Sequence, residues 1–330
     1  MDNSKKLISF DDTIYVAGHK GMVGSAILRK LKSAGYKNII TQSKNELDLT
    51  NDLKVKNWFK KYKPNIVILA AAKVGGIEAN KNYPSEFLLE NLKIQNNVID
   101  SAWQNKTKRF LFLGSSCIYP KFAKQPINEE QLLTGLLEKT NECYAIAKIA
   151  GIMLCKSLRE QYGFDAISLM PTNLYGPGDN FDLSEGHVLA ALIKKFCDAK
   201  QNNHNEIICW GTGAPFREFL HVDDLARACL FTLENWDPKN KQAPKDKDNK
   251  PLSFINVGTG KDISIKNLVA LIAKIVKFKG SIVWDKTKPD GTPKKQLEIK
   301  HLREIGWEAK ITLEEGLIST IDYYKSLNNY

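Results

Sequence analysis

The segment TIYVAGHKGMVG (residues 13–24) decides the fold of this 330-residue chain. Its first five residues form a short apolar run rich in β-forming side chains, and glycines then recur at Gly18, Gly21 and Gly24. Residues 22–34 continue with apolar side chains at helical spacing. A strand, a glycine turn and a helix in immediate succession predict the first unit of a parallel α/β sheet.

The remainder of the chain repeats this alternation of strand and helix. Short apolar runs predict further strands at residues 38–42, 65–72, 109–114, 165–170 and 254–257. Apolar residues at helical spacing predict helices at residues 51–62, 84–104, 142–162, 188–200 and 313–326. Such alternation requires right-handed crossovers and helices on both faces of the sheet. We therefore expect an α/β fold with a doubly wound parallel sheet (Rossmann), whose ligands bind outside the carboxyl ends of the strands.

The composition is that of a folded globular protein, with 43% hydrophobic and 26% charged residues. Lys and Arg (48) outnumber Asp and Glu (37), which gives a formal net charge of +11. The basic residues are scattered along the sequence rather than gathered into a stripe, so we expect a solvated lysine-rich surface and no nucleic-acid partner. A positive field of this kind also favours anionic small-molecule ligands.

The cysteines show no spacing typical of a zinc site or a disulfide framework. They are Cys117, Cys143, Cys155, Cys197, Cys209 and Cys229. We expect free thiols and no metal, which suits a reducing compartment. Residues 1–16 lack the apolar core of a secretion signal, and no run approaches the ~20 apolar residues of a membrane span. The sequence therefore predicts a cytoplasmic protein without a membrane partner.

The glycine turn predicts a site for the pyrophosphate of a dinucleotide, because backbone amides at a helix N-terminus bind phosphate where no Cβ intervenes. After the second expected strand, an acidic residue would bind the ribose of NAD, but the sequence there is Gln42-Ser43-Lys44. Lys44 and Lys20 offer two ammonium groups to a 2′-phosphate, which favours NADP(H). The alternative is that both are ordinary surface lysines. Asp48 would reach the adenine amine or cap the next helix.

Tyr144 and Lys148 are four residues apart near the start of an expected helix, so they share one face. A cation beside a phenol lowers its pKa, and we expect Lys148 to bring the pKa of Tyr144 toward neutrality. Such a tyrosine exchanges a proton with a carbonyl oxygen. Ser115, which follows the expected strand at 109–114, offers a hydroxyl to the same oxygen.

Together, the glycine turn, Ser115 and the Tyr144/Lys148 pair resemble the extended short-chain dehydrogenase/reductases. Within that superfamily, several blocks resemble the GDP-L-fucose synthase family, in matching order from about Val16 to Pro293. These blocks are AGHKGMVGSAI, LAAAKVGGI, FLGSSCIYP, KTNECYAIAKIAG, MPTNLYGPGDNF, REFLHVDDLA, INVGTG and KPDGTP.

The resemblance implies a two-part reaction on GDP-4-keto-6-deoxy-D-mannose. Carbons 3 and 5 are epimerised, and NADPH then reduces the ketone at carbon 4 to give GDP-L-fucose. The family's proton-transfer pair matches Cys117 and His187, whose residue types have unperturbed pKa values of ~8.5 and ~6.5, near the working pH. From the residues alone, the alternative for Cys117 is a packed apolar thiol, although its place two residues after Ser115 favours a function. Without the resemblance, His187 is interpreted as an ordinary loop histidine. The implied catalytic residues are Ser115, Cys117, Tyr144, Lys148 and His187.

The resemblance also implies two sets of binding residues. The cofactor-binding set is Gly18, His19, Lys20, Gly21, Met22, Val23, Gly24, Lys44, Asn45, Glu46, Leu47, Asp48, Leu49, Leu113, Gly114, Ser116, Lys148, Pro171, Thr172, Asn173, Leu174 and His187. The substrate-binding set is Asn173, Lys195, Trp210, Arg217 and Asp290. The family often has Arg where this chain has Lys20, Lys44 and Lys195, which exchanges a bidentate contact for a point charge.

The chain length exceeds the size of most single cores, so we expect two domains. Residues 1–170 are expected to form an NADP-binding Rossmann domain, joined by segments near 218–258. Residues 171–330 are expected to form mainly a smaller α/β domain that binds the GDP-sugar. The resemblance further implies a homodimer, paired through the helices at 84–104 and 142–162.

Two other functions remain open from the residues. The first is a related nucleotide-sugar 4-epimerase or dehydratase. Dehydratases of this superfamily usually carry an acidic residue shortly after the catalytic hydroxyl, whereas this chain has Ser115-Ser116-Cys117. A 4-epimerase requires no Cys/His pair. The second is a non-catalytic dinucleotide-sensing protein on the same fold, although such proteins tend to lose the Tyr/Lys pair.

Overall fold

A computed structural model describes residues 6–183, 186–288 and 290–328. Its main feature is a six-stranded sheet in which all neighbouring strands are parallel. In sheet order the strands are β2 (Ile39–Ile40), β1 (Ile14–Ala17), β3 (Ile66–Leu69), β4 (Arg109–Leu113), β5 (Ala166–Pro171) and β9 (Phe254–Val257). The strand order reverses between β1 and β3, which is where ligands bind in sheets of this kind.

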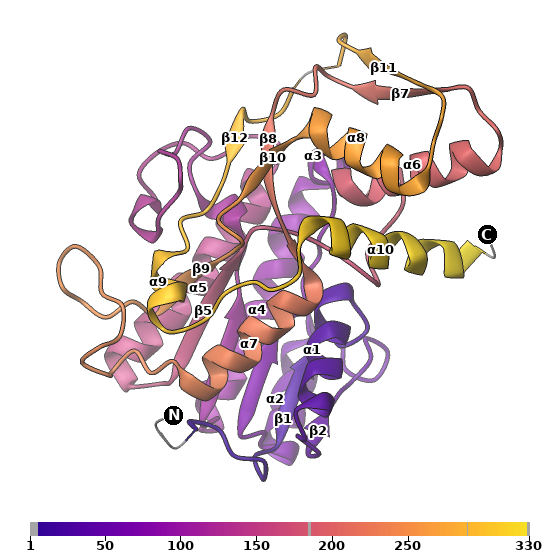
Figure 1. Ribbon diagram of the computed structural model, residues 1–330. Helices are drawn as coiled ribbons and strands as arrows, with labels where there is room; N and C mark the ends of the chain where they lie inside the picture. Colours follow the sequence, from indigo (N-terminus) through magenta and orange to yellow (C-terminus); the bar gives the residue numbers. More distant parts are fainter. Residues whose placement is uncertain (1–5, 184–185, 289, 329–330) are drawn as a thin grey trace.

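Helices cover both faces of this sheet (Figure 1). Because side chains alternate along a strand, Val16 and Ile68 belong to one core, whereas Tyr15 and Val67 belong to the other. The first core is closed by α1 (Met22–Ser33) and α7 (Val222–Asn235). The second is closed by α2 (Asp52–Tyr62), α4 (Pro84–Gln104) and α5 (Glu142–Tyr162). The expected doubly wound α/β fold is confirmed.

A second, smaller group of elements follows β5. One sheet contains β6 (Asn173–Tyr175), β8 (Phe216–His221), β10 (Asp262–Ser264) and β12 (Lys294–Lys295). A separate pair joins β7 (Glu206–Trp210) to β11 (Ser281–Asp285). A third core is formed largely by α6 (Val188–Gln201), α8 (Ile265–Val276) and α10 (Leu313–Asn328). Figure 1 shows α10 crossing between this group and the helices of the main sheet.

The predicted strands and helices are all present, and the bounds of α4, α5 and β9 coincide with those expected. The sequence did not reveal α7, α8, the short α3 (Ile77–Asn82) and α9 (Lys300–Glu304), or the strands of the smaller sheets. The proposed division at residue 170 stays a prediction, although β9 and α7 lie in the layers of the main sheet. Within the described ranges, no helix combines the length and apolar character that a bilayer crossing requires.

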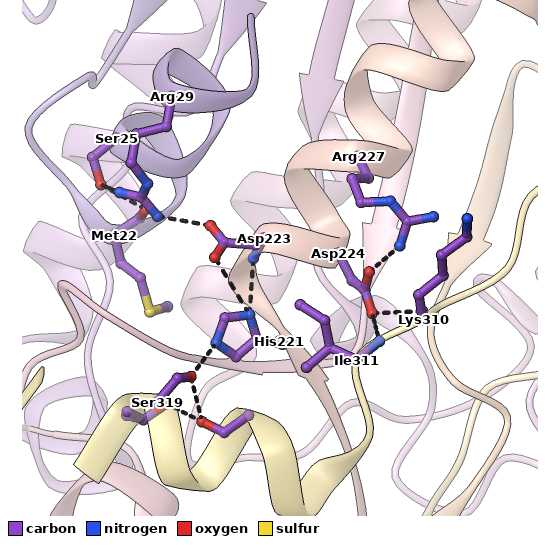
Figure 2. A network of polar contacts seen from close by, with 12 residues as sticks. Met22, Ser25, Arg29, His221, Asp223, Asp224, Arg227, Lys310, Ile311 and Ser319 are labelled. Carbon is purple, nitrogen blue, oxygen red and sulfur yellow. Dashed lines mark hydrogen bonds and ion pairs between the residues drawn. The ribbon is translucent and has the colours of Figure 1, made fainter. Parts of the chain in front are cut away.

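The start of α7 joins α1 to α10 through polar contacts (Figure 2). His221 caps α7 by accepting the Asp223 backbone N–H at 3.3 Å, and its Nε2 lies 3.3 Å from the Ser319 hydroxyl on α10. Asp223 pairs with Arg29 of α1 at 2.7 Å, where both side chains are well exposed. The start of α7 therefore holds two helices that are distant in sequence.

The neighbouring Asp224 is fully buried and ties down the segment before α10. Its carboxylate accepts the backbone N–H groups of Lys310 at 2.9 Å and Ile311 at 2.8 Å, and it pairs with Arg227 (Figure 2). A buried carboxylate is costly unless every oxygen is hydrogen-bonded in this way.

We predict that Asp224→Asn lowers the free energy of unfolding by about 2–4 kcal/mol, because an amide replaces an acceptor with a donor facing N–H groups. The matched control is Asp223→Asn, whose exposed ion pair with Arg29 contributes about 1 kcal/mol or less. Urea unfolding of both variants measures the difference. Equal destabilisation by the two substitutions would contradict the role assigned to Asp224.

Candidate active site

The glycine turn between β1 and α1 is packed too tightly for side chains at two positions. Gly18 has φ +86°, and a Cβ there would lie 2.7 Å from the Ala71 backbone. A Cβ on Gly24 would lie 2.1 Å from the Gly18 carbonyl oxygen. At Gly21, by contrast, a Cβ would meet only the Gly18 oxygen at 3.5 Å, so its outer side is open. Gly18 and Gly24 shape the turn, and Gly21 leaves room for a ligand.

The N-terminus of α1 fits the pyrophosphate of a dinucleotide. No side chain caps it and no acidic residue lies in its first turn, so its amides and positive dipole face outward. The buried Nδ1 of His19 has no hydrogen-bond partner among the described residues. These features match the predicted cofactor site at residues 18–24.

The residues after β2 form a turn in which Glu46 and Asp48 accept hydrogen bonds from neighbouring residues. Asp48 does not cap α2, which was one of its two expected roles. Glu46 accepts the Ser43 backbone N–H and hydroxyl at 2.7 and 2.6 Å, and these bonds lower the pKa of its carboxyl, aided by the charge of Lys20. Asp48 accepts the backbone N–H and hydroxyl of Thr50, which lower its pKa. The cap of α2 is instead Asn51.

Lys20 and Lys44 are both exposed at this end of the sheet. Asn45 is exposed as well, whereas Leu47 and Leu49 are buried in the core, so their side chains are not open to a cofactor. Because β1 and β3 separate β2 from β4, this region is distinct from the predicted catalytic residues that follow β4.

Ser115, Tyr144 and Lys148 come together beyond the end of β4. The hydroxyl of Ser115 acts on the phenol of Tyr144 and lowers its pKa, against the larger effect of burial. Lys148 is buried, its Nζ donates to the Leu113 carbonyl oxygen at 2.8 Å, and burial lowers its pKa to about 8. The Nζ also lies 5.8 Å from the centroid of the Tyr144 ring. The helix α5 thus presents both side chains on one face, as their spacing predicted, and their catalytic assignment stays a prediction.

The expected effect on Tyr144 is wrong in its direction. Burial, and then the charge of Cys117, raise the pKa of Tyr144, and the hydrogen bond from Ser115 offsets this only in part. The ammonium of Lys148 is directed to the Leu113 carbonyl and does not lower the pKa of the phenol. The environment of Tyr144 therefore favours the protonated phenol.

Cys117 lies in the 3₁₀ turn that Ser115 caps, with its backbone N–H 3.2 Å from the Ser115 hydroxyl oxygen. Its Sγ is 3.4 Å from Nδ2 of Asn141 and 3.5 Å from Nζ of Lys295. Burial acts to raise the pKa of the thiol, but Lys295, Ser115 and Asn141 outweigh it and the net shift is downward. Cys117 is not a packed apolar thiol.

His187 is the residue before α6, and it makes no capping hydrogen bond to that helix. Its side chain is accessible to solvent, yet protein surrounds it on most sides, and this burial lowers its pKa together with the charge of Lys295. Glu185, two residues before His187, lies outside the described residues.

The remaining predicted cofactor residues lie at the carboxyl ends of β4 and β5. Ser116 and Thr172 are buried, and the Thr172 hydroxyl donates to the Glu218 carbonyl oxygen at 3.3 Å. Gly114 is constrained, because a Cβ there would lie 2.4 Å from the sulfur of Met170. The others in this group are Leu113, Pro171, Asn173 and Leu174.

Residues 14–245 match the NAD dependent epimerase/dehydratase family. The chain is 52% identical to GDP-L-fucose synthase 1 from Arabidopsis thaliana, over 94% of this chain and 92% of that protein. It is 49% identical to GDP-L-fucose synthase from Escherichia coli (strain K12), over 94% of this chain and 96% of that protein. This chain belongs to the GDP-L-fucose synthase family.

A solved structure of a related protein has the same fold as this chain. The GDP-L-fucose synthetase from Naegleria fowleri bound to NADP matches with a TM-score of 0.85 and 28% sequence identity, covering 99% of this chain and 98% of that one. The glycine turn, β4 and α5 of this member of the GDP-L-fucose synthase family thus belong to a shared framework.

In this member of the GDP-L-fucose synthase family, the predicted substrate residues are spread over the smaller group of elements that follows β5. Trp210 ends β7 and is 59% exposed, with Nζ of Lys288 5.4 Å from its ring centroid. Lys195 donates to the Ile208 carbonyl oxygen at 2.7 Å. Asp290 accepts the backbone N–H of Thr212 at 2.9 Å and so supports the turn that follows Trp210.

Among the predicted substrate residues, Arg217 is the one whose pKa responds to Cys117. It lies in β8, and its Nη1 donates to the carbonyl oxygens of Phe216 at 2.7 Å and Thr292 at 2.6 Å. Burial lowers its pKa, whereas the charges of Asp290 and Cys117 act in the opposite direction. Asn173 lies in the neighbouring strand β6 and is held to β8, because its Nδ2 donates to the Glu218 carbonyl oxygen at 2.8 Å.

Three residues near the site had no recognised signal in the sequence. Asn141 lies in the KTNECYAIAKIAG block, where nothing marks it as functional. Lys295 lies just beyond the KPDGTP block. Glu218, fully buried, accepts the backbone N–H groups of Thr259 at 2.6 Å and Leu297 at 2.7 Å. Their roles depend on contacts between segments far apart in the chain. In the described ranges there is no cluster of His, Cys, Asp or Glu able to hold a metal.

Proposed function

We propose that this protein converts GDP-4-keto-6-deoxy-D-mannose to GDP-L-fucose, by epimerising carbons 3 and 5 and reducing the ketone at carbon 4 with NADPH. The observation that carries the proposal is the meeting of Ser115, Tyr144 and Lys148 with the thiol of Cys117, whose pKa neighbouring donors lower. A reductase alone requires the first three residues, and proton transfer at carbon requires the fourth. Membership of the GDP-L-fucose synthase family supports the substrate.

Reduction needs a proton donor at the ketone oxygen. Tyr144 supplies it, since burial raises its pKa and holds the phenolic proton. Ser115 donates a hydrogen bond to the same oxygen, and the ammonium of Lys148 stabilises the charge that develops there. NADPH, when bound, supplies a hydride. The amides of α1 and the residues after β2 orient that cofactor.

Epimerisation needs a base and an acid on opposite faces of the carbon beside the ketone. We assign Cys117 as the base and His187 as the acid. The hydrogen-bond donors at oxygen 4 serve this step as well, because removal of the proton places negative charge on that oxygen. One set of residues thus assists both half-reactions.

The GDP moiety is proposed to bind along Arg217 and Trp210, with Lys195 and Asp290 near them. Arg217 offers a guanidinium to the diphosphate, and the exposed ring of Trp210 offers an apolar face. Asp290 acts mainly through the turn that follows Trp210, because both its carboxylate oxygens bind Thr212.

The 4-epimerase and dehydratase alternatives have less support. A dehydratase is expected to have an acid near Ser115, but residues 116 and 117 are Ser and Cys. A 4-epimerase would have no use for a thiol held by Lys295 and Asn141. A non-catalytic sensor would require neither this thiol nor the Tyr144/Lys148 pair.

We propose a cytoplasmic location for this enzyme. The support is that Cys117, Cys143, Cys155, Cys197, Cys209 and Cys229 are all free thiols. Free thiols persist in a reducing compartment. No partner other than small molecules and a second copy of the chain is proposed.

We predict that NADPH is used more efficiently than NADH, and that Lys44→Glu removes most of this preference. The reason is that Lys44 and Lys20 can pair with the 2′-phosphate, which NADH lacks. Steady-state kcat/KM with each cofactor measures the preference. Lys60→Glu, an exposed substitution on α2, is the charge-matched control and should leave it unchanged. Equal efficiency with both cofactors in the unmodified enzyme would contradict the assignment.

We predict that Cys117→Ala abolishes deuterium incorporation at carbons 3 and 5 when the enzyme is incubated with the keto sugar and oxidised cofactor in deuterated water. Tyr144→Phe should reduce turnover with NADPH by ~10²–10⁴-fold while leaving slow exchange, because Ser115 and Lys148 still stabilise the enolate. Nuclear magnetic resonance of the sugar and loss of nicotinamide absorbance report the two half-reactions.

Two results would oppose the proposed reaction. If the unmodified protein gives no GDP-L-fucose from the keto sugar and NADPH, the function is wrong. If Cys117→Ala exchanges deuterium at the unmodified rate at both carbons, the assignment of the base is wrong, although the cofactor assignment survives.

We propose that the protein is a homodimer paired through α4 and α5. These helices pack on each other and expose large apolar side chains, namely Leu89 (53%), Ile146 (47%) and Met153 (39%). We predict that Met153→Arg shifts the protein to monomer in sedimentation velocity at micromolar concentration, whereas Met153→Leu leaves the dimer intact. A monomeric unmodified protein at this concentration would refute the proposal.

A further inference from the structure

The contact between Lys295 and Cys117 is not explained by the roles assigned so far. Nζ of Lys295 lies 3.5 Å from Sγ of Cys117, and Nδ2 of Asn141 lies 3.4 Å from the same sulfur. Both groups are donors, because an ammonium and an amide NH₂ carry no acceptor on these nitrogens. Two donors directed at one sulfur match the hydrogen-bonding needs of a thiolate rather than of a thiol.

The backbone fixes Lys295 in this position. It lies in β12, opposite Arg217 of β8 in the strand register. Two residues further on, the Leu297 N–H donates to the buried carboxylate of Glu218 at 2.7 Å. The Gln296 N–H donates to Oε1 of Gln125 at 2.9 Å. Since side chains alternate along a strand, the adjacent Lys294 points elsewhere, and it pairs with Asp262 at 3.1 Å.

Charged and titratable groups reach Cys117 from each element packed around it. Lys295 comes from β12, Arg217 from β8 and Tyr144 from α5. Burial acts to raise the pKa of the thiol, and the ammonium of Lys295 is the largest opposing influence. Burial lowers the pKa of His187, and the positive charge of Lys295 lowers it further. In addition, the negative charge of Glu138 acts to raise the pKa of Arg217.

We propose that Lys295 is a positioning residue that holds Cys117 as the thiolate, with Asn141 as the second donor, so that Cys117 is the group that removes the proton from carbon. This rests on the proposed epimerisation. In that step the thiolate takes the proton and an S–H bond forms. The electron pair of the broken C–H bond moves to the ketone oxygen, so one negative charge passes from sulfur to an oxygen that Ser115 and Tyr144 face.

The test is the pH dependence of alkylation of Cys117 by iodoacetamide in the free protein. The peptide that contains Cys117 is followed by mass spectrometry, which separates it from the other cysteines. The midpoint for the unmodified protein is expected below the ordinary thiol value of ~8.5. Lys295→Gln should raise the midpoint by about one pH unit or more, because an opposite charge at this distance favours the ionised form. Below the midpoint, this slows alkylation about tenfold.

Two variants separate charge from general structural change. Lys295→Arg keeps the positive charge and should restore most of the lowered midpoint. Lys294→Gln removes a lysine from the same strand but not from the thiol, and should leave the midpoint unchanged. Circular dichroism checks that each variant is folded. If Lys295→Gln is unfolded, Asn141→Asp tests the proposal instead. A carboxylate in place of the amide should raise the midpoint of Cys117 alkylation.

The proposal is overturned if folded Lys295→Gln keeps the unmodified midpoint, or if Lys294→Gln shifts it equally. An unchanged midpoint in Asn141→Asp would also overturn it. None of these measurements needs a nucleotide sugar, so a failure of the proposed reaction leaves their outcome readable. With the keto sugar present, the pH profile of deuterium incorporation should move by the same amount in Lys295→Gln.

Discussion

The carboxylate of Glu218, fully buried in β8, accepts the backbone N–H groups of Thr259, Gly260 and Leu297. Burial raises its pKa despite these bonds, so the fold carries a desolvation cost here that only complete hydrogen bonding offsets. The fit is close, because a Cβ on Gly258 would lie 2.2 Å from its Oε1. Through this one group, the loop after β9 and the segment that carries Lys295 are fixed to the strand that carries Arg217. The geometry of the thiol site depends on that connection.

Around this framework, burial and neighbouring polar or charged groups shift the pKa of a residue in opposite directions. Which effect is larger differs from residue to residue. At Tyr144 burial prevails and its pKa is raised, so the phenol remains a proton donor. At Lys148 burial lowers the pKa to about 8, which keeps a proton available close to neutral pH. At Cys117 the neighbouring donors prevail and its pKa is lowered. Groups packed together in one protein interior thus have pKa values shifted in different directions, which is typical of sites that move protons.

The main sheet was predictable because its signals are local. Buried parallel strands read as continuous apolar runs, and amphipathic helices read by their period, so α4, α5 and β9 could be bounded from the sequence. The strands β10 and β12 are two or three residues long and carry charged residues such as Asp262 and Lys294, which give no such pattern. Their pairing with β8 depends on residues far away in the sequence.

The sequence by itself determined the strand, glycine turn and helix that open the fold, the family blocks, and the spacing of Tyr144 and Lys148 on α5. These features arise from residues that are neighbours in the chain, where periodicity and backbone sterics suffice. Only the tertiary structure decided in which direction each pKa shifts, and which residue lies beside Cys117. Lys295 lies 178 positions from Cys117, yet its ammonium is 3.5 Å from the sulfur. A pKa depends on burial and on charges within a few ångströms, and chain folding sets both.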